Sequence, residues 1–300
     1  MILPRMIIII SSGGGNIDMK LLKVSGSLLL SSSLLFGCAN SNENTAKETV
    51  KESKNTISDS LYGVTDEYRE YAIGEIEEFV KATEAFTTAV KNGDLDKAKE
   101  LYASSRVHYE RAEPIAEVFG DLDPKIDARE GDVPEAEWGG YHRIEKGLWV
   151  DNTTTGYEQY AEQLMKDVNL LRAKVDTVEV TPDLLITGAV DLLNEVSTSK
   201  VTGEEDRYSH TDLFDFAANV EGADKIFQLL NPALKEKDEE LSKEIQTRFN
   251  DVFTLLNKHK KDGGYKVYTE LSEPEVKELS QAIDALAEPL SEIGIVTEAL

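Results

Sequence analysis

The residues in this chain that are best suited to chemistry are His142 and Glu145, which belong to a Gly-x-His-x-x-Glu motif that begins at Gly140. Residues three apart on a helix share one face, so this spacing places an imidazole nitrogen beside a carboxylate oxygen. Such a pair is half of a metal site. A single core histidine held by its neighbours would give the same pattern, and the aromatic residues around the motif fit either interpretation.

Two glutamates, Glu110 and Glu113, share a helix face beside an apolar stripe that includes Tyr109 and Ala112. Pro114 has no N–H to donate to the carbonyl of Glu110, so we expect the helix to bend there. A bent helix with two carboxylates at the edge of the core suggests a ligand site. A solvated glutamate–arginine face is the competing interpretation, and these residues alone do not decide between the two.

Another carboxylate, Asp127, lies between Pro124 and Pro134 in a segment that we expect to be a loop. Its side chain could reach a metal ion while Arg129 balances the charge. Taken alone, the segment is better explained as a turn with a surface ion pair.

Glu205 lies in an acidic run that follows Gly203. Thr202 and Glu205 have the spacing of a helix capping box, which would give Glu205 a purely structural role. The run also suits metal ligation. Three residues that follow it at helical spacing could orient a ligand: His210, Asp212 and Asp215.

The histidines and cysteines limit the metal chemistry. Cys38 is the only cysteine, so no disulfide can form within the chain and no other thiolate can bind a metal. Zinc peptidases of the common type need His-Glu-x-x-His, but Arg143 follows His142 here. The inverted form needs a histidine directly after the glutamate, where this chain has Lys146. A site rich in oxygen ligands with one histidine suits iron or manganese.

The first part of the chain has the features of a secretory signal. Two lysines precede a short leucine-rich run that ends at Leu35-Phe36-Gly37-Cys38, which is similar to a bacterial lipobox and implies that Cys38 is lipidated. The run is too short for a typical transmembrane helix. Met19 begins a complete signal by itself, so we expect residues 1–18 to be upstream sequence and the signal to end at residue 37. Residues 38–60 are polar and are predicted to form a flexible tether.

The chain is strongly acidic. Its formal charge is −25, and the charge of the chain from Cys38 on is near −27. A nucleic-acid-binding protein needs the opposite sign, so we exclude that class. The acidic surface suits cations, although solubility outside the cell would explain most of the charge.

From Val64 on, the apolar residues recur at helical spacing and alternating strand patterns are scarce. We expect an all-α fold of about eight helices, with breaks near residues 93, 122, 133, 153, 180, 204, 233 and 264. Helix starts are indicated by Thr181-Pro182 and by Ser272-Glu273-Pro274-Glu275. This part is too long for one ordinary helical bundle, so we expect two packed bundles.

Four segments, taken in their order along the chain, resemble the imelysin-like domain of the EfeO/EfeM iron-uptake proteins. The similarity covers the part of the chain from Leu61 to Leu300. One Gly-x-His-x-x-Glu motif would be weak evidence, but the ordered set is specific. The segments that carry the resemblance are residues 109–117, 126–130, 140–146 and 203–222.

The resemblance implies two four-helix bundles over residues 61–300 and a protein that binds iron, as Fe³⁺ or Fe²⁺ or another divalent metal. It implies service to a membrane iron permease and a haem peroxidase, at the outer face of the cell membrane, in a short form without a cupredoxin domain. Two alternatives remain, an imelysin-type metallopeptidase and a module that binds acidic polysaccharide through a metal. The metal site carried over from the family is Glu110, Glu113, Asp127, His142, Glu145 and Glu205.

Overall fold

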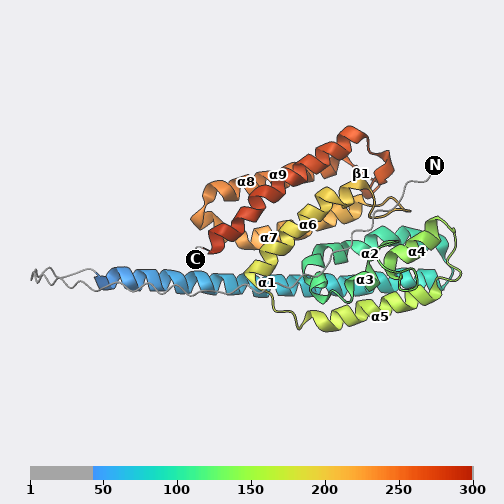
Figure 1. Ribbon diagram of the computed structural model, residues 1–300, viewed down its shortest axis with the longest axis horizontal. Coiled ribbons are helices and arrows are strands. Elements are labelled where there is room, and N and C mark those ends of the chain that lie inside the picture. The colour runs from blue at the N-terminus through green and yellow to red at the C-terminus, as the bar shows by residue number, and fades with distance from the viewer. Residues whose placement is uncertain (1–42, 299–300) are drawn as a thin grey trace, which may run out of the picture. The chain divides into compact units, whose positions relative to one another are not determined.

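The computed structural model describes residues 43–298, and helices dominate this range (Figure 1). The expected all-α class is confirmed. The segment predicted to be a tether differs in part, because the first helix already begins at Glu43 and its many lysines and glutamates are good helix formers. The helices are α1 Glu43–Lys91, α2 Leu95–Ala116, α3 Asp123–Ile126, α4 Gly140–Trp149, α5 Glu158–Val175, α6 Pro182–Thr198, α7 Leu213–Lys237, α8 Glu239–Lys258 and α9 Glu273–Glu298.

Short elements fill some of the connections between these helices. Residues Lys260–Lys261 (β1) and Gly264–Tyr265 (β2) pair as a small antiparallel hairpin after α8. Three single-turn 3₁₀ helices also occur: η1 Glu117–Phe119, η2 Lys200–Thr202 and η3 Tyr268–Glu270.

The first bundle consists of α1, α2, α4 and α5, with the short α3 against α4 and α5 (Figure 1). Aromatic side chains fill its centre. Phe86 of α1 stacks on Tyr141 of α4 with a centroid separation of 5.2 Å, and Phe79 of α1 lies 5.2 Å from Tyr109 of α2. Burial of such rings is the main favourable contribution to packing here.

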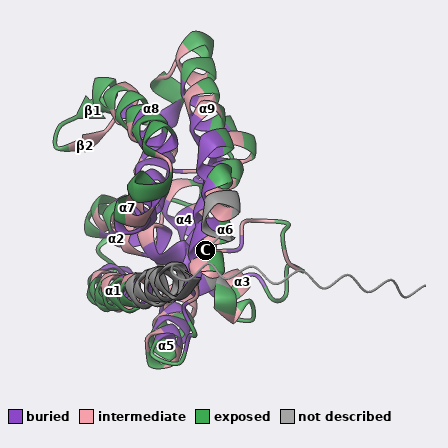
Figure 2. Ribbon diagram, turned by 90° about the vertical axis from the view of Figure 1, so that its left-hand side faces the viewer, coloured by how far each residue is buried: buried purple, intermediate pink, exposed green. Residues whose placement is uncertain are grey.

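The second bundle consists of α6, α7, α8 and α9. Helix α6 packs against α7 and α9, and α8 packs against the same two helices. Buried residues line the faces where the helices meet, and exposed residues lie on the outer faces (Figure 2). Together the two bundles confirm the expected architecture.

Helix α2 joins the two bundles, because it packs along α7 and also contacts α6. The close approach depends on a small residue, since a Cβ on Gly222 would lie only 2.6 Å from the backbone carbonyl oxygen of Arg111. The polar residues of α2 that face α7 are therefore enclosed between two bundles. This contact places Glu110 and Glu113 of α2 away from water.

The predicted helix starts are largely confirmed. The Thr181 side chain accepts a hydrogen bond from the N–H of Leu184 at the start of α6. Glu275 accepts hydrogen bonds from the backbone N–H and hydroxyl of Ser272, as a capping box requires. The break expected near residue 233 was wrong: Pro232 lies inside α7, which continues to Lys237 because buried leucines on both sides of the proline hold it in the bundle.

Pro114 lies in the last turn of α2, and the chain tightens into η1 directly after Ala116. The signal segment, Cys38 and the first residues of the predicted tether lie outside the described residues. Within residues 43–298, no helix combines the length and the apolar composition that a bilayer-spanning segment needs.

Gly140→Ala should destabilise the protein by more than about 1 kcal/mol. Gly140 has a φ of +73°, and a Cβ there would lie 2.3 Å from the carbonyl oxygen of Ile126 at the end of α3. The neighbouring Gly139→Ala is the matched control, because a Cβ at Gly139 meets no atom of the described chain within 4 Å. Urea unfolding should separate the two variants. Equal stability would contradict the observed packing of α4 on α3.

Candidate metal centre

The structure brings all six predicted site residues into one cluster between the two bundles. Glu110 and Glu113 come from α2, His142 and Glu145 from α4, Asp127 from the end of α3, and Glu205 from the segment before α7. Glu110 and Glu113 are buried, so the interpretation of this pair as a solvated helix face is wrong.

The alternative interpretation, in which Glu205 forms a helix capping box with Thr202, is wrong. Thr202 belongs to η2 and donates to the carbonyl of Ser199, and Gly203 follows with a φ of +78°. This turn directs the irregular segment 204–212 inward, and Glu205 is buried. The acidic run therefore delivers a carboxylate to the cluster.

Among the residues that the structure describes, three groups of acidic and histidine side chains lie close enough together to hold a metal ion. In two of the groups, other side chains of the protein already form hydrogen bonds with the candidate ligands. The groups are Asp127–His142–Glu205, His142–Glu145–Asp206 and Glu110–Glu205–Asp215.

The group of Glu110, Glu205 and Asp215 is bridged by the guanidinium of Arg106. Its Nη2 donates to Glu110 at 2.7 Å and to Glu205 at 3.3 Å, and its Nε donates to Asp215 at 3.1 Å. Arg106 is 1% exposed, so this cation is part of the core. A guanidinium at that position takes the place that a metal ion would need.

The group on the Nδ1 side of His142 is satisfied by hydrogen bonds. Nδ1 of His142 lies 3.1 Å from Oε2 of Glu145, and the Tyr102 hydroxyl lies 3.2 Å from the same nitrogen while it donates to Asp206 at 2.8 Å. Nδ1 therefore carries a proton in this network.

The remaining group, Asp127, His142 and Glu205, has an unsatisfied atom at its centre. Nε2 of His142 is buried and has no hydrogen-bond partner within residues 43–298. It lies 3.6 Å from Oδ1 of Asp127 and 3.9 Å from Oε1 of Glu205, and both of these oxygens also accept hydrogen bonds from Arg106. Two ligands that are each about 2.1 Å from one ion can be at most about 4.2 Å apart, so both separations suit a shared metal ion.

Glu145 is placed to orient the imidazole. Its Oε1 accepts hydrogen bonds from the N–H groups of Tyr208 and Ser209 and from the Ser209 hydroxyl, at 3.0, 2.8 and 2.9 Å. Its Oε2 faces Nδ1 of His142. A carboxylate on the far nitrogen fixes the tautomer and ring orientation of a metal-binding histidine. Glu145 therefore contacts Nδ1 of His142, whereas Asp127 lies on the Nε2 side of the ring.

Glu110 and Glu113 lie beside a second buried cation. Nζ of Lys200 is 2.8 Å from Oε2 of Glu110 and 3.4 Å from Oε2 of Glu113. The side-chain N–H₂ of Asn219 donates to the same two oxygens at 3.1 and 2.7 Å.

The buried charges shift the proton affinities of the candidate ligands in opposite directions. Burial raises the pKa of Asp127 to about 7, against the opposing effect of Arg106. Burial would also raise the pKa of Glu205, but Lys200, His142 and Arg106 together lower it to about 2. Burial and Arg106 lower the pKa of His142, yet the hydrogen bond to Glu145 and the charge of Asp127 raise it overall.

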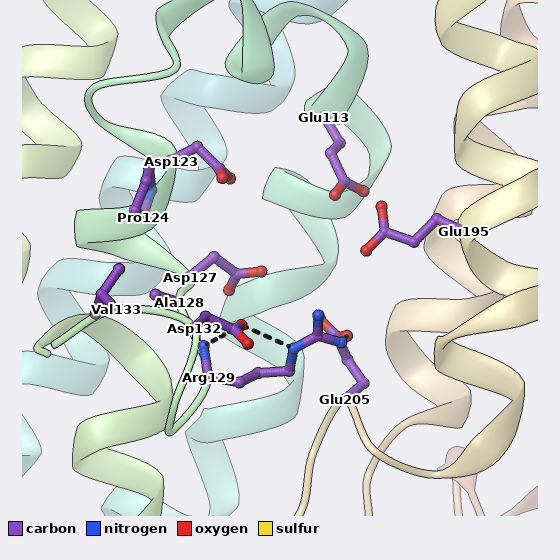
Figure 3. Close-up of a pocket in the computed structure, with 10 residues that line it drawn as sticks. All are labelled: Glu113, Asp123, Pro124, Asp127, Ala128, Arg129, Asp132, Val133, Glu195 and Glu205. Carbon is purple, nitrogen blue, oxygen red and sulfur yellow. Dashed lines mark hydrogen bonds and ion pairs between the residues drawn. The ribbon is translucent and has the colours of Figure 1, made fainter. Parts of the chain in front are cut away.

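A cavity of about 210 Å³ leads to this cluster from the surface (Figure 3). Asp127, Glu113, Glu195 and Glu205 line it, and in the view Glu113 and Glu195 point toward each other. Arg129 lies at Glu205, to which its Nη1 donates at 3.0 Å, and its Nε also donates to Asp132. Arg129 thus balances charge as expected, but chiefly that of Glu205.

Several residues of the centre were not found from the sequence. Arg106 precedes Glu110 by four residues, a spacing that puts both on one helix face, so this partner was open to prediction. Tyr102 lies one turn earlier on that face. Lys200, Asn219 and Glu195 gave no local signal, because only the packing of α2 between α6 and α7 brings them to the cluster.

Three residues were expected from the sequence to orient a ligand, and two of them, Asp212 and Asp215, are buried in the core. Asp215 accepts from Arg106, and Oδ1 of Asp212 accepts from the N–H of Asp206 at 3.2 Å. His210 instead uses its backbone carbonyl, which accepts from the N–H of Tyr268.

Comparison of the chain with known proteins identifies its family. The model of the imelysin family (peptidase M75) matches residues 64–293. An Efem/EfeO family lipoprotein of Staphylococcus haemolyticus (strain JCSC1435) is 50% identical over 282 residues, which cover 90% of this chain and 98% of that protein. An Efem/EfeO family lipoprotein of Staphylococcus aureus (strain NCTC 8325 / PS 47) is 50% identical over 244 residues, which cover 79% and 86% of the two chains. The chain therefore belongs to the imelysin family and, within it, to the EfeM/EfeO lipoproteins.

Proposed function

We propose that this protein captures iron outside the cytoplasm and supplies it to a membrane iron permease. The metal ligands in this proposal are Asp127, His142 and Glu205. The observation that supports it best is the buried Nε2 of His142, which has no hydrogen-bond partner among the described residues and faces carboxylate oxygens of Asp127 and Glu205, two residues that line an acidic cavity. A buried polar atom without a partner is costly, and a bound cation would satisfy it.

The charge of the centre favours a highly charged ion. Carboxylate oxygens are hard ligands and one imidazole is a borderline ligand, so iron and manganese fit this donor set. The Coulomb attraction to the carboxylates grows with the charge of the ion, which favours Fe³⁺ over Fe²⁺. Cavity access from the surface suits capture and later release of a cargo ion.

The proposed location and partners depend on the family. The matched staphylococcal proteins are named lipoproteins, and Cys38 ends a segment similar to a lipobox. In this proposal the lipid on Cys38 anchors the protein at the outer face of the cell membrane. The permease and a haem peroxidase of the same uptake system are its partners there.

A metallopeptidase is the second candidate, because the family is also classed with the M75 peptidases. The general base of that reaction would be Glu145, by analogy with the glutamate of zinc peptidase motifs. Its two oxygens instead accept hydrogen bonds from Tyr208, Ser209 and His142, which leaves little capacity to activate a water molecule. Metal-dependent peptide cleavage that is lost in Glu145→Gln would favour the peptidase.

His142→Ala should abolish tight iron binding, because it removes the only nitrogen ligand. Glu145→Gln keeps that ligand but loses its charged support, so we expect a smaller loss of about 10–100-fold in affinity. His108→Ala is the matched control, because His108 on α2 pairs with Glu75 away from the centre. Calorimetry on the three variants measures the effect. Wild-type affinity in His142→Ala would rule out the assigned site.

Iron affinity should fall as the pH falls below about 7. The pKa of Asp127 is raised to about 7 in the metal-free protein and that of His142 is also raised, so protons compete with the metal for both ligands. Each displaced proton costs up to about tenfold in affinity per pH unit. Anaerobic calorimetry with Fe²⁺ at several pH values tests this. An affinity unchanged from about pH 8 to about pH 5.5 would contradict the ligand set.

Cys38→Ser should abolish lipid attachment, because the thiol is the group that the proposed anchor modifies. Cells that express the wild type should incorporate labelled palmitate into the protein, and cells that express the variant should not. Equal labelling of both proteins would show that the anchor lies elsewhere.

A further inference from the structure

The side chain of Lys200 lies inside the metal centre rather than at its edge. Lys200 begins η2, directly after α6, and is 1% exposed. Its Nζ lies 2.8 Å from Glu110, 3.4 Å from Glu113 and 3.7 Å from Oε1 of Glu205. An ammonium group so deeply buried needs such partners, because an isolated buried charge is strongly unfavourable.

Glu205 is shared between Lys200 and the proposed metal position. The same oxygen, Oε1, is 3.7 Å from Nζ of Lys200 and 3.9 Å from Nε2 of His142. A carboxylate placed between two cations is the arrangement found in two-metal sites, where the ions lie about 3.5–4 Å apart. Here one of the two cations is the end of a side chain.

The two glutamates on the far side of Lys200 complete this second cation position. Both oxygens of Glu110 are engaged, Oε1 by Arg106 and Oε2 by Lys200 and Asn219. Oε2 of Glu113 accepts from Lys200 and Asn219. These carboxylates therefore already have cationic and amide partners in the folded chain.

We propose that Lys200 is the residue that limits the centre to one metal ion, by holding a second cation position that its ammonium group occupies. The proposal rests on the proposed function, because it takes the first ion to lie on Asp127, His142 and Glu205. A second metal ion would have to displace Lys200 or bear its repulsion at close range. Without that charge, Oε2 of Glu110 and Oε2 of Glu113 lose their cationic partner and offer oxygen ligands to a second ion, while Arg106 keeps Oε1 of Glu110. The cavity that Glu113 and Glu205 line gives the ion access (Figure 3).

The test is the number of iron ions per chain, measured by elemental analysis of the folded, iron-loaded protein after removal of free metal. Wild type should hold one ion. Lys200→Met, which removes the charge and keeps most of the length, should hold two. Lys200→Arg is the matched control that keeps the charge and should hold one. Lys200→Gln also removes the charge but keeps polar atoms at the site, so it should hold two ions as well. It replaces Lys200→Met in the test if that variant does not fold.

Electron paramagnetic resonance supplies a second readout. The ferric wild type should give the signal of an isolated high-spin ion, and the neutral variants should lose much of it through coupling of two neighbouring ions. One ion per chain in both neutral variants, or two ions in the wild type, would overturn the role of Lys200 while leaving iron capture intact. A wild type that binds no iron would overturn the proposed function itself.

Discussion

The buried guanidinium of Arg106 is the interaction on which the metal centre depends. It donates to Glu110 on its own helix, to Asp127 at the end of α3, to Glu205 in the segment before α7 and to Asp215 within α7. These carboxylates come from four parts of the chain, and without a shared cation they would repel one another. Removal of one partner from a buried ion pair typically costs about 3–5 kcal/mol. Arg106 thus allows a cluster of acids to form before any metal arrives.

The cations of the chain engage the carboxylates of the cluster, including Asp127 and Glu205, but leave Nε2 of His142 without a hydrogen bond among the described residues. Arg106 and Lys200 occupy two places among the carboxylates, and Nδ1 of His142 is satisfied because it donates toward Glu145, beside the Tyr102 hydroxyl. Nε2 of His142 faces carboxylate oxygens of Asp127 and Glu205 and has no hydrogen bond within the described residues. The fixed positive charges would also limit how tightly an ion is held, which suits the proposed transfer of the ion to a permease.

Local signals in the sequence predicted much of the fold and part of the centre. Helical periodicity and the capping residues Thr181 and Ser272 fixed most of the helices, because these depend on neighbours in the chain. The spacing of His142 and Glu145 predicted their shared face. It did not distinguish a ligand from the residue that orients it, because that depends on donors from Tyr208 and Ser209 in a distant segment. Lys200 and Asn219 could not be predicted for the same reason. The helix break predicted near Pro232 was wrong because the packing of α7 in its bundle outweighs the local effect of the proline.

The position of the bound ion tests this account most directly. Crystals soaked with iron and measured on both sides of the iron absorption edge would locate it by anomalous scattering. The account predicts one peak within bonding distance of Nε2 of His142 and of the carboxylates of Asp127 and Glu205. A peak on the Nδ1 side, between Glu145 and Asp206, or no peak at the cluster, would contradict it.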